Sequence, residues 1–165
     1  MTGHSGETAN PFWTFSLRLY GLDGVASACL ALQDRFGADV NLVLYALWRV
    51  EQGAGAWGGA ECRAAMASVA PLSRQVIQPL RAVRKSLAKE GEEAALREAV
   101  KNLELEAEKL EQDRLFAASP GLSGAEAKDR DASEAALAVY AEALEADRTA
   151  FLKAAGPLVE AFCVA

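Results

Sequence analysis

Apolar residues recur at intervals of three and four along almost the whole chain, and this helical period limits the fold more than any other feature. One series runs from Val25 to Phe36 and a second from Val40 to Val50. Neither the alternation of a strand nor a repeat of fixed length is visible. We therefore predict an all-α, single-domain helical bundle of about seven helices with a long C-terminal helical hairpin.

Glycine, proline and capping residues mark where these helices begin and end. Asn10 and Pro11 open the first helix, Gly37 ends the second and Asp39 caps the third. Gly53–Gly59, read as GAGAWGG, is a break whose Trp57 is expected to dock on the core. A fourth helix is predicted at 61–70, halted by Pro71, and a fifth at 73–89, which Pro79 either kinks or restarts. A sixth helix is predicted at 92–117. The seventh is predicted to run from 126 or 131 to 154 and to be followed by a break at Gly156-Pro157.

The same punctuation predicts how the chain is organised. Residues 1–9 are small and polar and are predicted to form a disordered tail. Residues 10–165 are predicted to form one helical domain, with an aromatic-rich cluster over 10–70 and a long-helix hairpin over 72–165.

Composition argues against several classes of function. The net charge of -6 argues against nucleic-acid binding, because phosphate backbones attract basic surfaces. No apolar run reaches the roughly 18 residues of a membrane span, and the start lacks the pattern of a secretory signal. The three cysteines are widely spaced, as is typical of reduced thiols. These three observations together predict that the protein is located in the cytoplasm.

Catalytic and metal motifs are not visible in the sequence. His4 is the single histidine and falls in the predicted tail, so neither a zinc site nor a Ser-His or Cys-His couple is expected. The GAGAWGG segment follows a helix and lacks the lysine of a phosphate-binding loop. We predict no catalytic residue, no metal ligand and no cofactor.

Charged residues form two series on neighbouring predicted helices. Glu104, Glu108 and Glu111 share one helical face, which we interpret as a solvated surface. The basic series consists of Arg74, Arg81, Arg84, Lys85 and Lys89. It would bind a phosphorylated ligand or an acidic partner, or else pack beside the acidic 92–117 helix of the same molecule, and we favour the packing interpretation.

The junction between the second and third predicted helices, LQDRFGADVNLVLYALW, offers the best candidate for a binding site. If these helices form a hairpin, polar side chains converge at the turn next to aromatic ones. The candidate ligand-binding residues are Gln33, Asp39, Asn41, Trp48 and Arg81. The structural alternative, which we favour, is that Asp39 caps a helix, Asn41 satisfies first-turn N–H groups and the aromatic residues are core.

Two segments resemble a known family. The residues NPFWTFSLRLYGLDGVASACLALQDRFGADVNLVLYALW, Asn10 to Trp48, resemble the N-terminal signature of an uncharacterised domain-of-unknown-function family of small bacterial proteins. PLRAVRKSL, Pro79 to Leu87, is similar to a second block of that family. The resemblance implies a bacterial, proteobacterial, cytosolic helical protein, and it implies no activity, cofactor or catalytic residue.

The absence of catalytic motifs and the long charged helices favour a noncatalytic protein-interaction or adaptor module. Its partner is an unknown protein or a second copy of the chain, because the seam of Leu96, Val100, Leu103, Ala107 and Leu110 neither requires nor forbids another chain. The alternative is a small-molecule binder or enzyme with a pocket at the five candidate residues.

Overall fold

The computed structural model describes residues 10–119, 121–122 and 128–165, and over these residues the chain is all-α. Its helices are α1 (Pro11–Tyr20), α2 (Val25–Phe36), α3 (Val40–Glu51), α4 (Gly59–Leu72), η1 (Ser73–Ile77), α5 (Gln78–Ser86), η2 (Gly91–Glu93), α6 (Ala94–Ala117), α7 (Arg130–Ala143) and α8 (Arg148–Val164). Because α4, η1 and α5 run on without a break, as do η2 and α6, the described chain has seven separate helical segments. The predicted fold class is confirmed, and the predicted tail at 1–9 lies outside the described residues.

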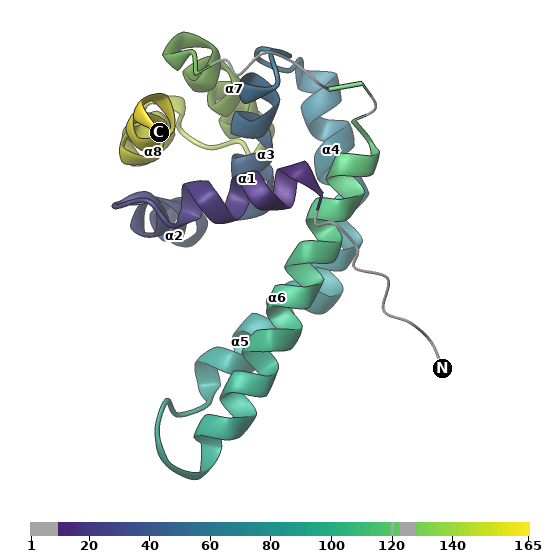
Figure 1. Ribbon diagram of the computed structural model, residues 1–165, viewed down its shortest axis with the longest axis vertical. Helices are drawn as coiled ribbons and strands as arrows, with labels where there is room; N and C mark the ends of the chain where they lie inside the picture. The colour runs from purple at the N-terminus through teal and green to yellow at the C-terminus, as the bar shows by residue number, and fades with distance from the viewer. Residues whose placement is uncertain (1–9, 120, 123–127) are drawn as a thin grey trace.

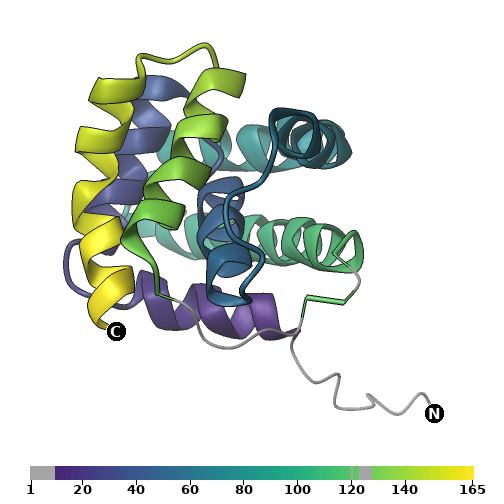
Figure 2. The same ribbon diagram turned by 90° about the horizontal axis from the view of Figure 1, so that it is seen from above.

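The molecule has a rounded body and an arm (Figure 1). Helices α1, α2, α3, α7 and α8 form the body, together with most of α4 and the C-terminal half of α6. The hairpin of α5 and the N-terminal half of α6 extends away from the body as the arm. Seen from above, α7 and α8 lie side by side over α2 and α3 (Figure 2). Chain beyond residue 72 therefore forms two helical hairpins, α5–α6 and α7–α8. The division of the domain into 10–70 and 72–165 stays a prediction.

The main core is built around α3, in which every residue from Asn41 to Glu51 is buried. Phe12 packs against Tyr45 and Trp48, with ring centroids 5.5 and 5.4 Å away, and Phe116 approaches Trp48 from α6. Trp57 docks on this core as predicted, and its indole N–H donates to the carbonyl of Ala136 at 2.9 Å. A separate, smaller cluster of Leu72, Ile77 and Ala107 lies where the arm begins.

The α2–α3 junction forms as the sequence predicts. Gly37 ends α2 in the left-handed region, at φ 65°, which glycine adopts without steric cost. Asp39 caps α3 by accepting from the backbone N–H of Asn41 at 3.0 Å. Its own backbone N–H donates to the hydroxyl of Tyr140 at 2.8 Å, so α7 holds the junction in place.

Two predicted helix boundaries are wrong. Pro71 does not halt a helix, because α4 passes through it and continues into the π-helical turn η1 before Pro79. A proline nitrogen cannot donate to the preceding turn, and the widened π-turn lies just before Pro79. In the C-terminal region, α7 ends at Ala143 and α8 runs through Pro157. Glu145 supplies the left-handed turn, at φ 57°, and Asp147 caps α8, so no glycine or proline marks this break.

Among the described residues, no single helix is both long and apolar enough to cross a membrane. Helices α1 and α2 pass that test as a pair, but they bend by 100° where they join.

Candidate functional site

Two neighbouring cavities that share lining residues lie where the arm meets the body. The first, which we call the groove, has a volume of about 360 Å³ and lies between α1, the α2–α3 region, α5 and α6. The second, which we call the chamber, has a volume of about 350 Å³ and lies between the α2–α3 junction, η1, α5 and α6. Both are lined by Gln33, Val40, Asn41, Arg81 and Glu108. Volumes of this size fall at the lower end of those of small-molecule sites.

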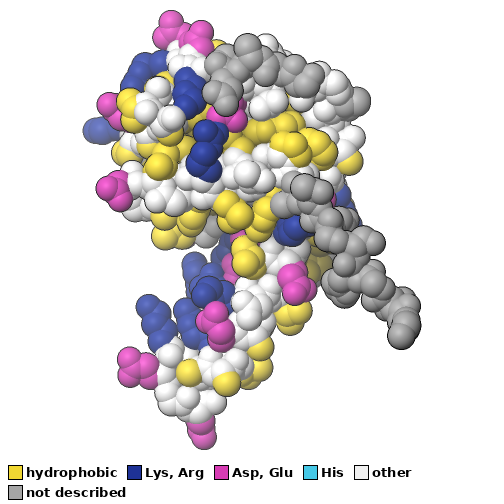
Figure 3. Space-filling model, in the orientation of Figure 1, with side chains coloured by type: hydrophobic (Ala, Val, Ile, Leu, Met, Phe, Trp, Pro, Cys, Tyr) yellow, Lys and Arg dark blue, Asp and Glu magenta, His cyan; other side chains and the backbone are white. Residues whose placement is uncertain are grey.

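One wall of the groove is apolar although it is open to solvent. Leu17 and Tyr20 of α1, Leu30 of α2 and Leu105 of α6 line it and are between 40% and 57% exposed. Hydrophobic and basic side chains gather on the surface where the arm meets the body (Figure 3). Exposed apolar side chains concentrated around one hollow mark a surface on which another molecule can bury them.

The opposite wall is an ion-pair network between α5 and α6. Arg81 donates from Nε to Glu104 at 2.9 Å and from a terminal nitrogen to Glu108 at 2.7 Å, and Arg84 donates to the same Glu104. Although burial alone favours the neutral acid, the hydrogen bonds from Arg84 and Arg81 hold the pKa of Glu104 below its usual value. Two residues of the basic series, Arg81 and Arg84, thus pair with the acidic helix, as we favoured from the sequence.

The interpretation of Glu104, Glu108 and Glu111 as a solvated face is wrong. Glu104 and Glu111 are buried and Glu108 is only partly exposed, because α6 presents this face to α3, η1 and α5. The spacing that identifies a shared face cannot say whether that face meets water or another helix.

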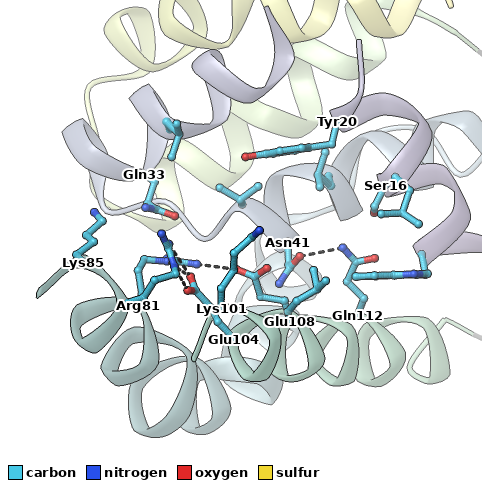
Figure 4. A pocket seen from close by; sticks show the side chains of 17 residues that line it. Ser16, Tyr20, Gln33, Asn41, Arg81, Lys85, Lys101, Glu104, Glu108 and Gln112 are labelled. Carbon is cyan, nitrogen blue, oxygen red and sulfur yellow. Dashed lines mark hydrogen bonds and ion pairs between the residues drawn. The ribbon is translucent and has the colours of Figure 1, made fainter. Parts of the chain in front are cut away.

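A chain of buried amides and a carboxyl group links α3 to α6. The side-chain amide of Gln112 donates to the carbonyl oxygen of Asn41 at 2.8 Å, and the Asn41 amide donates to Oε2 of Glu111 at 2.6 Å. Figure 4 shows Asn41 and Gln112 at one end of the groove and Arg81 and Glu104 at the other. Asn41 is only 7% exposed, so its side chain holds α6 instead of serving first-turn N–H groups.

Burial changes the acidity of two carboxyl groups in the chamber. Burial, and after it the neighbouring carboxylate of Asp39, together raise the pKa of Glu111 to about 8. Burial also raises the pKa of Glu108, although Arg81 opposes this. At neutral pH Glu111 therefore holds a proton that a surface glutamate would have lost.

Hydrogen-bonding capacity is left unused at this site. In the described part of the chain, four buried side-chain nitrogen or oxygen atoms have no hydrogen-bond partner. Three belong to residues that line the two cavities: Ser16 Oγ and Gln112 Oε1 in the groove, and Glu111 Oε1 in the chamber. The fourth, Arg49 Nε, belongs to a residue that lines neither cavity. Buried polar atoms rarely lack partners, so their concentration here points to a bound molecule that supplies them.

Four of the five candidate residues meet at this site. Gln33, Asn41 and Arg81 line both cavities and Asp39 lines the chamber. Trp48 does not line either one, because it is 1% exposed and packs in the aromatic core. Whether these residues bind a ligand stays a prediction.

Sequence reasoning missed Ser16 and Gln112, and it assigned Glu111 to a solvated surface. The four-then-three spacing of Glu104, Glu108 and Glu111 was a usable signal for Glu111, since it placed a carboxyl group on the face that α6 turns toward α3. For Ser16, a single small polar residue on an apolar helix offered no signal of its own. Within the described residues, no group of three or more His, Cys, Asp or Glu side chains is placed to hold a metal ion.

Comparison with known proteins identifies one family. The model of the family described as "Protein of unknown function (DUF2390)" matches residues 11–115, which include every residue of the groove and the chamber. No curated protein matches the chain. No solved structure matches it.

Proposed function

The chain belongs to the DUF2390 family, whose description names no activity, and from the geometry of its site we propose that it binds a small molecule with an apolar body. The apolar body lies in the groove, against Leu17, Tyr20 and Leu105. Its polar groups satisfy the unpartnered oxygens of Ser16 and Gln112. This binding takes place in the bacterial cytoplasm, a placement supported by the composition and by the resemblance of the N-terminal half.

One coincidence carries this proposal: exposed apolar side chains and unpartnered buried polar atoms occur around the same hollow. A folding role explains neither feature, because packing would cover the leucines and internal hydrogen bonds would satisfy the oxygens. A ligand with an apolar body and a polar end meets both needs at once.

The test uses octan-1-ol as an apolar probe and two variants of α6. Leu105 lines the groove at 48% exposure, whereas Leu103 lies two residues away at 52% exposure and lines neither cavity. We expect the probe to raise the melting temperature of the wild type and of Leu103→Gln, but not of Leu105→Gln, since only a ligand of the native state stabilises it. Equal responses from the two variants, or no response from the wild type, would refute binding in the groove.

A second candidate function, noncatalytic protein interaction, is favoured by the outer face of α6. Leu96, Leu103 and Leu110 follow each other at seven-residue spacing on α6 and are between 46% and 57% exposed. Val100 and Ala107 of the same predicted seam are buried. The partner that this stripe fits is a second copy of the chain, because two such stripes are complementary to each other.

Light scattering tests the second candidate. If the stripe joins two copies, the wild type has twice the mass of its chain and Leu103→Glu has the mass of one chain. A monomeric wild type at high concentration would exclude the homodimer.

A further inference from the structure

The chamber holds more negative than positive charge. Asp39, Glu108 and Glu111 line it, and Arg81 is the cationic residue among them. Arg81 is already paired with Glu104 and Glu108. Within the described residues, Asp39 and Glu111 belong to no ion pair, and a buried carboxyl group without a cation is costly to ionise.

The unused hydrogen-bonding capacity of the chamber lies on Glu111. Asp39 accepts from the backbone of Asn41 with Oδ1 and from the hydroxyl of Ser73 with Oδ2 at 3.0 Å. Glu111 accepts from Asn41 with Oε2, while its Oε1 has no hydrogen-bond donor and its side chain is 1% exposed. In the free protein Glu111 and Asp39 are two neighbouring carboxyl groups that hold one proton between them, and a cationic donor can take the place of that proton.

Resting on the proposed function, we propose that the ligand carries a primary ammonium group, which enters the chamber and donates to Glu111 and Asp39 while the apolar body stays in the groove. The two cavities share Asn41, Arg81 and Glu108, so the two ends of such a ligand lie against the same side chains. An ammonium group brings three N–H donors to acceptors on different elements. A bare metal ion fits less well, because the described carboxylates do not form a ligand cluster.

Binding of the ammonium group exchanges a proton. The groups that face Glu111 are Asp39 and Asn41 of the α2–α3 junction, Ser73 of η1, Arg81 of α5, Glu108 of α6 and Tyr140 of α7. In the free protein at pH 7, Glu111 is protonated, since its pKa is raised to about 8. The ammonium group favours the carboxylate, so the neutral acid gives its proton to solvent and a carboxylate–ammonium pair forms. The affinity for the amine therefore increases as pH rises from 6 to 8.

Isothermal titration calorimetry with three eight-carbon probes tests this proposal. The probes are octylamine, octan-1-ol and octanoate, which share an apolar body and differ at the polar end. We expect octylamine to bind roughly tenfold more tightly than octan-1-ol at pH 7. Binding of octylamine should release about one proton, which the buffer takes up. We therefore expect the measured heat of binding to change with the ionisation enthalpy of the buffer.

Two variants separate this proposal from a purely structural role of the chamber. Glu111→Gln mimics the protonated acid and Asp39→Asn keeps a helix cap, so both preserve the fold. Each is expected to lose the preference for octylamine and to bind octan-1-ol like the wild type. If the Glu111→Gln protein kept that preference, or if octanoate bound the wild type as tightly as octylamine, the amine proposal would be wrong although the groove still binds. If none of the probes bound, the proposed function itself would fail.

Discussion

At the scale of single residues, burial rather than identity decides what a side chain does in this protein. Glu111 and Glu106 lie five positions apart on α6, yet Glu106 is exposed while Glu111 is enclosed beside Asp39. Desolvation, followed by the repulsion of Asp39, raises the pKa of Glu111 to about 8. Folding therefore binds a proton at this residue, and stability depends on pH.

The expected pH dependence follows from the sign of this shift. The pKa of Glu111 is raised from an ordinary value of 4.5, so between pH 4.5 and about 8 the native state binds a proton that the unfolded state lacks. The contribution of Glu111 to the free energy of unfolding is complete below pH 4.5 and is lost as pH rises to about 8. In urea titrations at several pH values, Glu111→Gln should show a shallower decline than the wild type. Glu106→Gln is the matched control. If the free energy of unfolding declined in parallel with pH for the wild type and both variants, the raised pKa of Glu111 would be contradicted.

Gly37 is a second residue whose role can be tested. Its φ of 65° is costly for a side chain with a Cβ, although a Cβ there would meet nothing within 4 Å. Gly37→Ala should lower the free energy of unfolding by about 1 kcal/mol, and Gly37→Asn by less, because asparagine tolerates the left-handed region better. Chemical denaturation measures both. Equal losses would mean that the backbone conformation is not the cause.

At the scale of elements, α6 has two faces with different tasks. Its inner face carries Glu104, Glu108 and Gln112 toward α3 and α5, and its outer face carries Leu96 and Leu103. Glu104 joins the two helices of the arm, since it accepts from both Arg81 and Arg84. Ion pairing rather than a large apolar interface therefore connects α5 to α6.

Removing the charge of Glu104 should weaken this connection. Glu104→Gln leaves Arg84 without its carboxylate partner and Arg81 with Glu108 alone, and we expect a loss of about 2 kcal/mol, less than for a fully buried pair because the arginines are partly exposed. Glu106→Gln on the exposed face of α6 should change stability by less than about 0.5 kcal/mol. Thermal and urea denaturation give both values, and indistinguishable variants would show that the network contributes little.

At the scale of the whole molecule, stability is unevenly distributed between the body and the arm. The main core joins α1, α2, α3, α7 and α8, whereas α5 has no buried residue and the arm begins at a cluster of Leu72, Ile77 and Ala107. Since few apolar contacts hold it, the arm should open without unfolding the body.

Hydrogen exchange checks this difference. Amide protons of α5 are expected to exchange with a much lower opening free energy than those of α3. A ligand in the groove contacts both parts, so octan-1-ol should slow exchange in α5 more than in α8. Uniform protection across α3 and α5 would mean that arm and body unfold together.

The sequence by itself determined the helical class, the α2–α3 junction and most helix boundaries. These depend on local physics: apolar spacing, the freedom of Gly37 and the cap of Asp39 act within a few residues. The boundaries that failed are those where tertiary packing carries helix through Pro71 and Pro157 and where Glu145 turns the chain without a glycine.

The tertiary structure alone decided the site. Spacing placed Glu104, Glu108 and Glu111 on one face, and placed Gln33, Asp39 and Asn41 near one turn, but whether these faces meet depends on how α6 crosses α3 and α5. That crossing buries Glu111 and leaves one of its oxygens without an N–H or O–H donor. Trp48 instead packs in the aromatic core against Phe12 and Tyr45. Burial and desolvation depend on every neighbour in space, and a local pattern contains no information about neighbours that are 70 residues away along the chain, as Asn41 is from Glu111.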